Sequence, residues 1–305
     1  MKIVIQVIIF LIIIGVVYEQ ISRFNVEEKF PPIGDTVNVV GHNLHYVQKG
    51  LGTGSVIFEA GSDPSGTLSW SKVQDEVSKY TQTLSYDRAG LSWSERGEHP
   101  KTAENIAIEL HTLLEETNMT KPYILVGHSF GCLTLRSFVR KYPTEVRAIV
   151  FVDASHPKQN EMYKKEAFTI PRWLVSMANN MGVVRLFSNQ NTYPNTDKNE
   201  SINSNMQGMM FKGVDTIVEE MNVFDKVAKE VESINTFNDI PLTVISSIQD
   251  DDKVWIELQK DLLNLSTNSR HIMTKESGHY IQLEEPRLVV EEIQKLIIGE
   301  EKNSK

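Results

Sequence analysis

The amino-acid sequence predicts an α/β fold, with a mostly parallel sheet that has helices on both of its faces. Short runs of β-branched and other apolar residues alternate along the chain with segments whose apolar residues recur at helical spacing. One long stretch, residues 157–238, breaks this alternation because it has helical patches but no convincing strand. The 305 residues, of which 40% are hydrophobic, suffice for one large α/β domain.

The chain starts with an apolar segment, residues 1–22, which we expect to anchor it in a membrane. Residues 3–18 are nearly all Ile, Val, Leu and Phe, and only Gln6 and Gly15 interrupt them. This length lies between a signal-peptide core and the roughly 20 residues of a spanning helix. Bulky residues where a cleavage site would lie favour an uncleaved anchor, and a secreted protein after signal cleavage is the alternative. Lys2 favours a cytoplasmic N-terminus and therefore an extracytoplasmic location for the folded domain.

The folded core is expected in two parts, residues 35–156 and 239–305. Residues 23–34 include Pro31 and Pro32 and are predicted to be a linker. The predicted strands are residues 37–40, 44–48, 56–59, 83–86, 123–126, 148–152, 242–246 and 270–274. The predicted helices include residues 103–116, 132–142, 254–264 and 287–298.

The intervening residues 157–238 are interpreted as a helical lid over an active site. Seven of the ten methionines fall in this segment. Methionine is flexible and suits adaptable apolar surfaces, although ordinary helix packing also explains any single one of them. A helical insert between two strands of an α/β sheet is naturally placed to cover the edge where ligands bind.

Composition argues against several classes of partner. The net charge is −9 and no strongly basic stretch is present, so nucleic acid is not expected as a partner. The single cysteine, Cys132, cannot form an intrachain disulfide, and we interpret it as a small packing residue. The eight histidines show no metal-ligand spacing, and we expect neither a metal nor another cofactor. The sequence leaves the oligomeric state open.

Residues 123–132 contain the pattern Gly127-x-Ser129-x-Gly131, directly after an apolar strand and before a helical pattern. Glycines on both sides allow a sharp turn that lifts the serine hydroxyl off the end of the sheet, at the N-terminus of a helix. The bare pattern arises often by chance, but here it lies between a strand and a helix. Ser129 is therefore the candidate nucleophile. His128 is adjacent to it and is interpreted as a packing residue.

Four segments in order resemble the α/β-hydrolase superfamily, specifically its lid-containing, serine-nucleophile members of the esterase and lipase type. The resemblance extends from about residue 37 to the C-terminus. The segments are Ile57-Phe58-Glu59-Ala60-Gly61-Ser62, the turn Asp87-Arg88-Ala89-Gly90-Leu91-Ser92-Trp93-Ser94, the elbow Gly127 to Gly131, and Ser277-Gly278-His279 to Glu284-Glu285-Pro286. Ser92 stands where the family's turn has a second glycine. These motifs are specific for the fold and not for the substrate.

The resemblance implies a catalytic triad with His279 as the base, since the histidine comes last in the chain order of this superfamily. The acid is open between two residues. Asp153 and Asp250 each follow a predicted strand, and we slightly favour Asp153 because the run Val152-Asp153-x-Ser155-His156 resembles relatives without an acid at the later position. The resemblance further implies an oxyanion hole formed by the backbone N–H groups of Ser62 and Phe130.

The predicted activity is that of a serine hydrolase, which cleaves an ester or related acyl bond through an acyl-enzyme. A hydrophobic lid and a membrane tether favour an apolar small-molecule substrate. Superfamily members that use an aspartate nucleophile are disfavoured by Ser129. The alternative is a non-catalytic or weakly catalytic ligand-binding or signalling protein on the same fold, since some such receptors keep their triad.

Overall fold

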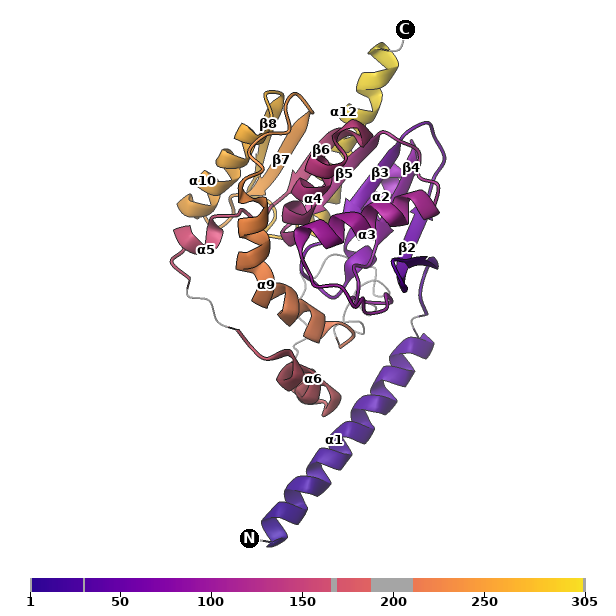
Figure 1. Ribbon diagram of the computed structural model, residues 1–305, viewed down its shortest axis with the longest axis vertical. Helices are drawn as coiled ribbons and strands as arrows, with labels where there is room; N and C mark the ends of the chain where they lie inside the picture. The colour runs from indigo at the N-terminus through magenta and orange to yellow at the C-terminus, as the bar shows by residue number, and fades with distance from the viewer. Residues whose placement is uncertain (1, 30, 166–168, 188–210, 304–305) are drawn as a thin grey trace.

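A computed structural model describes residues 2–29, 31–165, 169–187 and 211–303, and an eight-stranded sheet forms its centre (Figure 1). In spatial order the strands are β1 (Asp35–Val39), β2 (His42–Lys49), β4 (Gln82–Tyr86), β3 (Ser55–Glu59), β5 (Tyr123–His128), β6 (Val146–Val152), β7 (Leu242–Ser247) and β8 (Ser269–Thr274). All eight strands predicted from the sequence are present, with ends within two residues of the predicted ones. The predicted fold class is confirmed.

Strand β2 runs antiparallel to the other seven strands of the sheet, which share one direction. β1 pairs antiparallel with β2, and β2 pairs antiparallel with β4. A two-residue turn joins β1 to β2, and both of its residues, Val40 and Gly41, have positive φ (51° and 94°). Positive φ at both central residues is typical of a type I′ hairpin, the turn whose twist matches that of paired strands.

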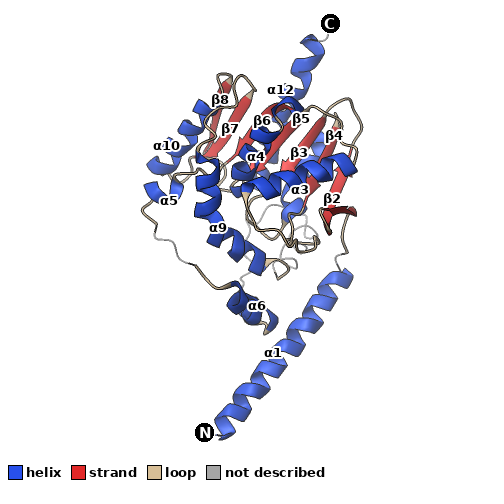
Figure 2. Ribbon diagram, in the orientation of Figure 1, coloured by secondary structure: helices blue, strands red, loops and turns tan. Residues whose placement is uncertain are grey.

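Helices cover both faces of the sheet, and Figure 2 shows them in front of it and behind it. One face packs on α3 (Ala103–Glu116), α4 (Phe130–Lys141) and α9 (Val214–Glu232), and the other on α2 (Ser71–Val77) and α12 (Pro286–Asn303). In β5, Leu125 belongs to the first core cluster, whereas Ile124 and Val126 belong to the second. This alternation explains why the strand is a continuous apolar run, since both of its faces are buried.

The segment between β6 and β7 is helical where it is described. It contains α5 (Gln159–Met162), α6 (Arg172–Asn180), α7 (Val183–Phe187) and α9, while residues 166–168 and 188–210 of the predicted lid lie outside the described residues. The second half of the core adds α10 (Lys253–Asp261) and α11 (Ile281–Glu284). Three 3₁₀ turns complete the described elements, namely η1 (Gly66–Trp70), η2 (Pro143–Glu145) and η3 (Leu262–Leu265).

The N-terminal segment forms one long helix, α1 (Lys2–Lys29), which extends away from the sheet on the side where α6 lies (Figure 1). The helix is longer than the predicted anchor, so the first part of the predicted linker, up to Lys29, is helical. Among the described residues, α1 is the helix that is long and apolar enough to cross a membrane, with a mean hydropathy of 2.4. A signal sequence would show the same features.

Candidate active site

Ser129 occupies a sharp turn between β5 and α4. Its backbone has φ 49° and ψ −123°, a conformation that residues with a side chain rarely adopt. Such strain persists only where the surrounding structure holds it, and it is concentrated at functional sites. The strain places the hydroxyl at the carboxyl end of the parallel strands, the edge of an open α/β sheet where ligands bind.

The glycines on both sides of Ser129 are required by close packing. A Cβ atom on Gly131 would lie 2.5 Å from the carbonyl oxygen of Ala60, and one on Gly127 would lie 2.8 Å from Cδ1 of Leu135. Both distances are shorter than carbon atoms tolerate. At Gly131 the pattern therefore has a direct steric cause, because the contacted atom belongs to the backbone, whereas the atom close to Gly127 is the end of the flexible Leu135 side chain.

Ser129, His279 and Asp153 are joined by hydrogen bonds, although 126 residues separate the aspartate from the histidine in the chain. Nε2 of His279 lies 3.0 Å from Oγ of Ser129, and Nδ1 of the same ring lies 2.6 Å from Oδ2 of Asp153. The carboxylate only accepts hydrogen bonds, so Nδ1 carries the proton and Nε2 is free to accept one from the serine. This is the arrangement in which a histidine acts as a base toward a serine.

The structure brings Asp153, and not Asp250, against His279. The second oxygen of Asp153 accepts a hydrogen bond of 2.9 Å from the backbone N–H of Ser247 and another of 2.9 Å from Nε1 of Trp255. The Asp153 carboxylate is thus buried, and both of its oxygens accept hydrogen bonds. Asp250 is exposed in the loop after β7. No sequence pattern identified Trp255, whose contact with Asp153 depends on how α10 packs beside β7.

Hydrogen bonds with Glu284, Glu285 and His128 fix the loop that carries His279. Glu284 accepts a hydrogen bond of 2.7 Å from the backbone N–H of Gly278, and Glu285 accepts one of 3.0 Å from Oγ of Ser277. His128 is buried, and its Nε2 donates to the carbonyl oxygen of His279 at 2.9 Å. Burial holds the pKa of His128 well below its ordinary value, so the ring is neutral. The interpretation of His128 as packing alone was incomplete, because its side chain also positions His279.

A cavity of about 380 Å³ opens beside Ser129. Both predicted oxyanion-hole residues, Ser62 and Phe130, line it. Phe130 is the first residue of α4, where backbone N–H groups have no partner within the helix and the helix dipole favours negative charge. The remaining lining combines apolar side chains, Met221 and Phe224, with polar ones, which are Ser155, Gln159, Asn160, Lys165, Thr169, Glu220, Asn222 and Asp225.

A buried ionic network lies behind the loop that contains Ser62. Nη1 and Nη2 of Arg88 donate to the carbonyl oxygens of Ala60 and Gly61, at 2.5 and 2.7 Å. The same guanidinium pairs with Glu59 at 2.6 Å and with Glu220 of α9 at 2.8 Å, and all three side chains are at most 1% exposed. Glu220 in turn accepts a hydrogen bond of 2.6 Å from Oγ of Ser62.

The network joins the proposed oxyanion loop to the inserted helix α9. Burial alone would oppose the charge of Glu220, but Arg88 and Lys101 hold its pKa below the ordinary value. Sequence reasoning missed Arg88 and Glu220. Arg88 lies in the recognised turn motif just after β4, and membership of that motif was the signal in the sequence that could have identified it. Nothing in the sequence indicated its partner, which lies 132 residues away.

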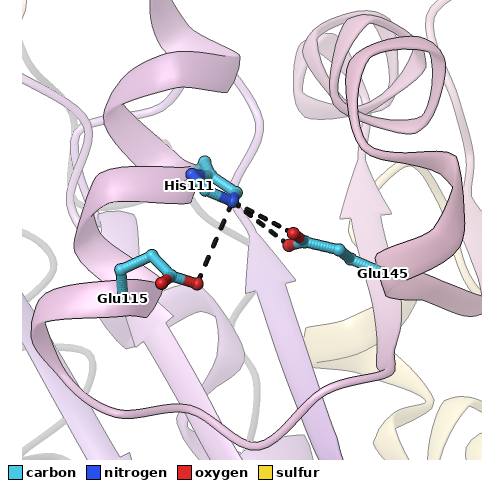
Figure 3. A group of neighbouring side chains, drawn as sticks. All are labelled: His111, Glu115 and Glu145. Carbon is cyan, nitrogen blue, oxygen red and sulfur yellow. Dashed lines mark hydrogen bonds and ion pairs between the residues drawn. The ribbon is translucent and has the colours of Figure 1, made fainter.

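Two further features outside this site carry potentially reactive side chains, a thiol and a group of possible metal ligands. Cys132 is buried, and burial raises the pKa of its thiol well above the ordinary value, which does not suit a nucleophile. His111, Glu115 and Glu145 bring potential metal-ligand atoms within 4.8 Å of one another (Figure 3). The ammonium of Lys121 already contacts Glu115 at 2.5 Å and Glu145 at 2.9 Å. We therefore interpret this group as an ion-pair cluster that ties α3 to η2.

A mostly parallel eight-stranded sheet with a strand–serine–helix turn at its carboxyl edge defines the class of α/β hydrolases. A family model described as the alpha/beta hydrolase fold matches residues 50–286. The chain belongs to this family, and the resemblance inferred from its motifs is confirmed.

Similar proteins are known from fungi and bacteria. The chain is 22% identical over 285 residues to an AB hydrolase superfamily protein of Gibberella zeae, covering 79% of this chain and 85% of that protein. It is 25% identical over 255 residues to the uncharacterized protein YqjL of Bacillus subtilis, covering 81% and 84%.

Among solved structures, an esterase from Thermogutta terrifontis has a TM-score of 0.68 at 16% identity, with 87% of this chain and 98% of the esterase covered. An epoxide hydrolase from Bacillus megaterium has a TM-score of 0.66 at 18% identity, with 86% and 99% covered. At such low identities, these structures establish the shared fold and leave the substrate open.

Proposed function

We propose that this protein is a membrane-tethered serine hydrolase that cleaves an ester or related acyl bond of a small molecule with an apolar acyl part. The observation that carries the proposal is the pair of hydrogen bonds, 3.0 and 2.6 Å long, that joins Ser129 to His279 and His279 to Asp153. A serine hydroxyl is a weak nucleophile unless an oriented base removes its proton. The Asp153 carboxylate orients His279 for this task.

In the proposed reaction, Oγ of Ser129 attacks the carbonyl carbon of the substrate while its proton passes to Nε2 of His279. The developing oxyanion accepts hydrogen bonds from the backbone N–H groups of Ser62 and Phe130. Fixed donors of this kind typically contribute about 3 to 4 kcal/mol each. His279 then gives the proton to the leaving alcohol, and an acyl-enzyme remains. The same base activates water, which releases the acid and regenerates the hydroxyl of Ser129.

The substrate class is inferred from the cavity lining. The side chains of Phe130, Met221 and Phe224 offer apolar surface to an acyl group. Asn160 and Asn222 lie at the same cavity and suit a polar head group. The helices between β6 and β7 are proposed to act as the lid, since α9 supplies several of these side chains. Helix α1 is proposed to anchor the protein as an uncleaved span.

The proposal is tested by assaying the full chain in detergent against p-nitrophenyl esters of increasing acyl length. Ser129→Ala is expected to abolish hydrolysis, and the preferred chain length describes the cavity. Ser155→Ala is the matched control, because its hydroxyl lies 3.5 Å from Oγ of Ser129 and does not contact His279 in the proposed mechanism. If the folded wild type hydrolyses no ester faster than Ser129→Ala, the esterase proposal fails, and the ligand-binding alternative takes its place.

A further inference from the structure

Helix α1 is joined to the inserted segment by contacts on one of its faces. A Cβ atom on Gly15 would lie 2.5 Å from the carbonyl oxygen of Met181, so the two backbones touch at the turn before α7. One helical turn later, the carboxylate of Glu19 receives two hydrogen bonds from Arg185 of α7, at 2.7 and 3.1 Å. Glu19 is 0% exposed. The same carboxylate also pairs with Arg23 of α1 at 2.7 Å, so Glu19 joins two arginines, one on α1 and one on α7.

The position of these contacts along α1 sets the depth of α6 and α7 relative to a membrane. The apolar run of α1, residues 3–18, has a length of roughly 24 Å at 1.5 Å per residue, close to the hydrocarbon thickness of a bilayer. Gly15 and Glu19 lie at the end of that run nearest the folded core. A segment packed against them therefore lies at the boundary between hydrocarbon and water.

The outer side chains of this segment are those that such a boundary favours. Trp173 is 68% exposed, Met177 is 47% exposed, and Leu174 is also exposed, all three on α6. Leu186 of α7 is 78% exposed. An indole is the side chain most enriched where lipid chains meet head groups, and helices with large apolar side chains on one face lie in the plane of that boundary. In a soluble protein, the same cluster would be an apolar patch in contact with water.

The chain leads directly from this surface to the cavity. Thr169 lines the cavity, and α6 begins three residues later at Arg172. Between them, the backbone of Ile170 exchanges two hydrogen bonds, of 3.1 and 2.8 Å, with the side chain of Asn222, another cavity residue. Figure 1 shows α6 between α1 and the part of the molecule that contains α9. The rim of the cavity and the apolar surface of α6 are thus parts of one connected segment.

We propose that α6 and α7 form a membrane-docking surface, with Trp173, Leu174, Met177 and Leu186 inserted into the lipid bilayer that α1 spans. The occupant of this surface is a phospholipid bilayer, since the exposed apolar side chains of α6 and α7 continue the apolar surface of α1. The rim of the cavity then lies at the lipid boundary, and an ester dissolved in the bilayer enters the cavity without crossing water. The inference rests on the proposed anchor and on the proposed esterase activity.

The first test places the full chain in phosphatidylcholine vesicles whose acyl chains carry bromine near the head group, and compares tryptophan emission with that in unbrominated vesicles. The chain has four tryptophans, so the emission of Trp173 is obtained by subtracting the emission of Trp173→Phe from that of the wild type. The proposal predicts that brominated lipid quenches this difference signal. If brominated lipid leaves it unchanged, the docking surface is ruled out, whether or not the enzyme is active.

The second test measures function with a matched pair of variants. Met177→Glu places a charge on the docking surface, whereas Met273→Glu places one on β8, at a methionine of similar exposure (50%). Met177→Glu is expected to lower the turnover of a long-chain ester carried in vesicles by about 10-fold, because a carboxylate is disfavoured in the bilayer. Turnover of soluble p-nitrophenyl butyrate is expected to stay unchanged. Met273→Glu is expected to change neither rate.

The outcomes of the two tests separate the proposals. If Met177→Glu and Met273→Glu behave alike on the vesicle-borne ester, the docking surface plays no part in substrate entry and the inference is overturned. If soluble esters are hydrolysed but Trp173 is not quenched, the proposed function stands and the docking surface is rejected. If Trp173 is quenched but no ester is hydrolysed, the docking surface stands and the proposed function is rejected.

Discussion

The carboxylate of Asp153 accepts three hydrogen bonds, from the His279 ring, from Trp255 and from the backbone of Ser247. Two donors fix one oxygen, so the other oxygen faces Nδ1 of His279 in a single orientation. The ring can then present only its unprotonated Nε2 to Ser129. Residues that do not contact the substrate thereby determine the tautomer of the proposed base.

Asp153→Asn is expected to lower kcat by roughly 10³- to 10⁴-fold, because an amide in this position favours the wrong tautomer of His279. Asp250→Asn is the matched control and is expected to leave kcat unchanged. Steady-state assays of both variants on one soluble ester make the comparison. A severe loss in Asp250→Asn with an active Asp153→Asn would reverse the assignment of the acid.

Asp63 follows the proposed oxyanion residue Ser62 and makes stability depend on pH. Burial raises its pKa from 3.8 to about 6. Between these values the folded chain retains a proton that the unfolded chain releases, so this contribution to stability is complete below about pH 4 and is lost as pH rises to about 6. The loss corresponds to about 3 kcal/mol, at 1.36 kcal/mol for each pKa unit.

Asp63→Asn removes this titration. Relative to the wild type, the variant is expected to gain stability as pH rises from 4 to 6 and to keep that gain at higher pH. Urea unfolding of both chains at several pH values measures the difference in free energy of unfolding. A difference that does not change with pH would show that Asp63 does not titrate in this range.

Helix α9 contributes a buried charge to the proposed oxyanion loop through Glu220. Glu220→Gln leaves Arg88 with an uncompensated part of its charge and weakens the acceptor of the Ser62 hydroxyl. We expect a loss of about 3 kcal/mol in the free energy of unfolding and a fall in kcat of about 10-fold. Glu219→Gln, at the neighbouring and partly exposed position, is the control and is expected to change stability by less than about 1 kcal/mol. Equal effects of the two variants would refute the coupling between α9 and the loop.

The central strands of this fold could be predicted because their sequences are buried on both faces. β5 begins with the apolar run Tyr123 to Val126, and β6 is apolar except for Arg147, while glycine, proline or polar residues at their ends mark where they stop. Likewise, the turn at Ser129 is marked by two glycines, and at Gly131 a side chain would clash with the backbone of Ala60. Local sequence was sufficient for these elements because local sterics determine them.

The parts that could not be predicted depend on contacts between distant segments. Trp255 reaches Asp153 across 102 residues, and Ser62 reaches Glu220 across 158. Each contact depends on the packing angle of a helix, which a single sequence does not encode in any local pattern. The same reason left Asp153 and Asp250 open as the acid, since both residues follow a strand of the same sheet edge.

In the whole molecule, α1 and α6 lie beyond the same edge of the sheet, and α9 extends from the sheet toward α6 (Figure 1). Contacts connect them in series, because α1 packs on α6, α6 packs on α9, and α9 packs on the nucleophile helix α4. Helix α1 is therefore part of the packed structure, which an unstructured tether would not be. A cleaved signal peptide that included Glu19 would remove the ion pair between Glu19 and Arg185.

We accordingly expect α1 to remain uncleaved when the full chain is expressed in cells and inserted in a membrane. Alkaline carbonate should leave the protein in the membrane pellet, and the mass of the intact protein should include residues 2–29. A chain lacking residues 2–29 is the control and is expected in the supernatant. Recovery of a mature chain that starts after Tyr18 would establish the signal peptide in place of the anchor.

The central claim is that Ser129 forms a covalent acyl intermediate with its proton accepted by His279. The most direct measurement is the intact mass of the full chain after reaction with a fluorophosphonate, followed by mapping of the modified peptide. The account predicts a single adduct on Ser129, formed at least about 100-fold more slowly in His279→Ala and absent in Ser129→Ala. An adduct on another residue, or no adduct on a folded chain, would contradict the claim that this protein is a serine hydrolase.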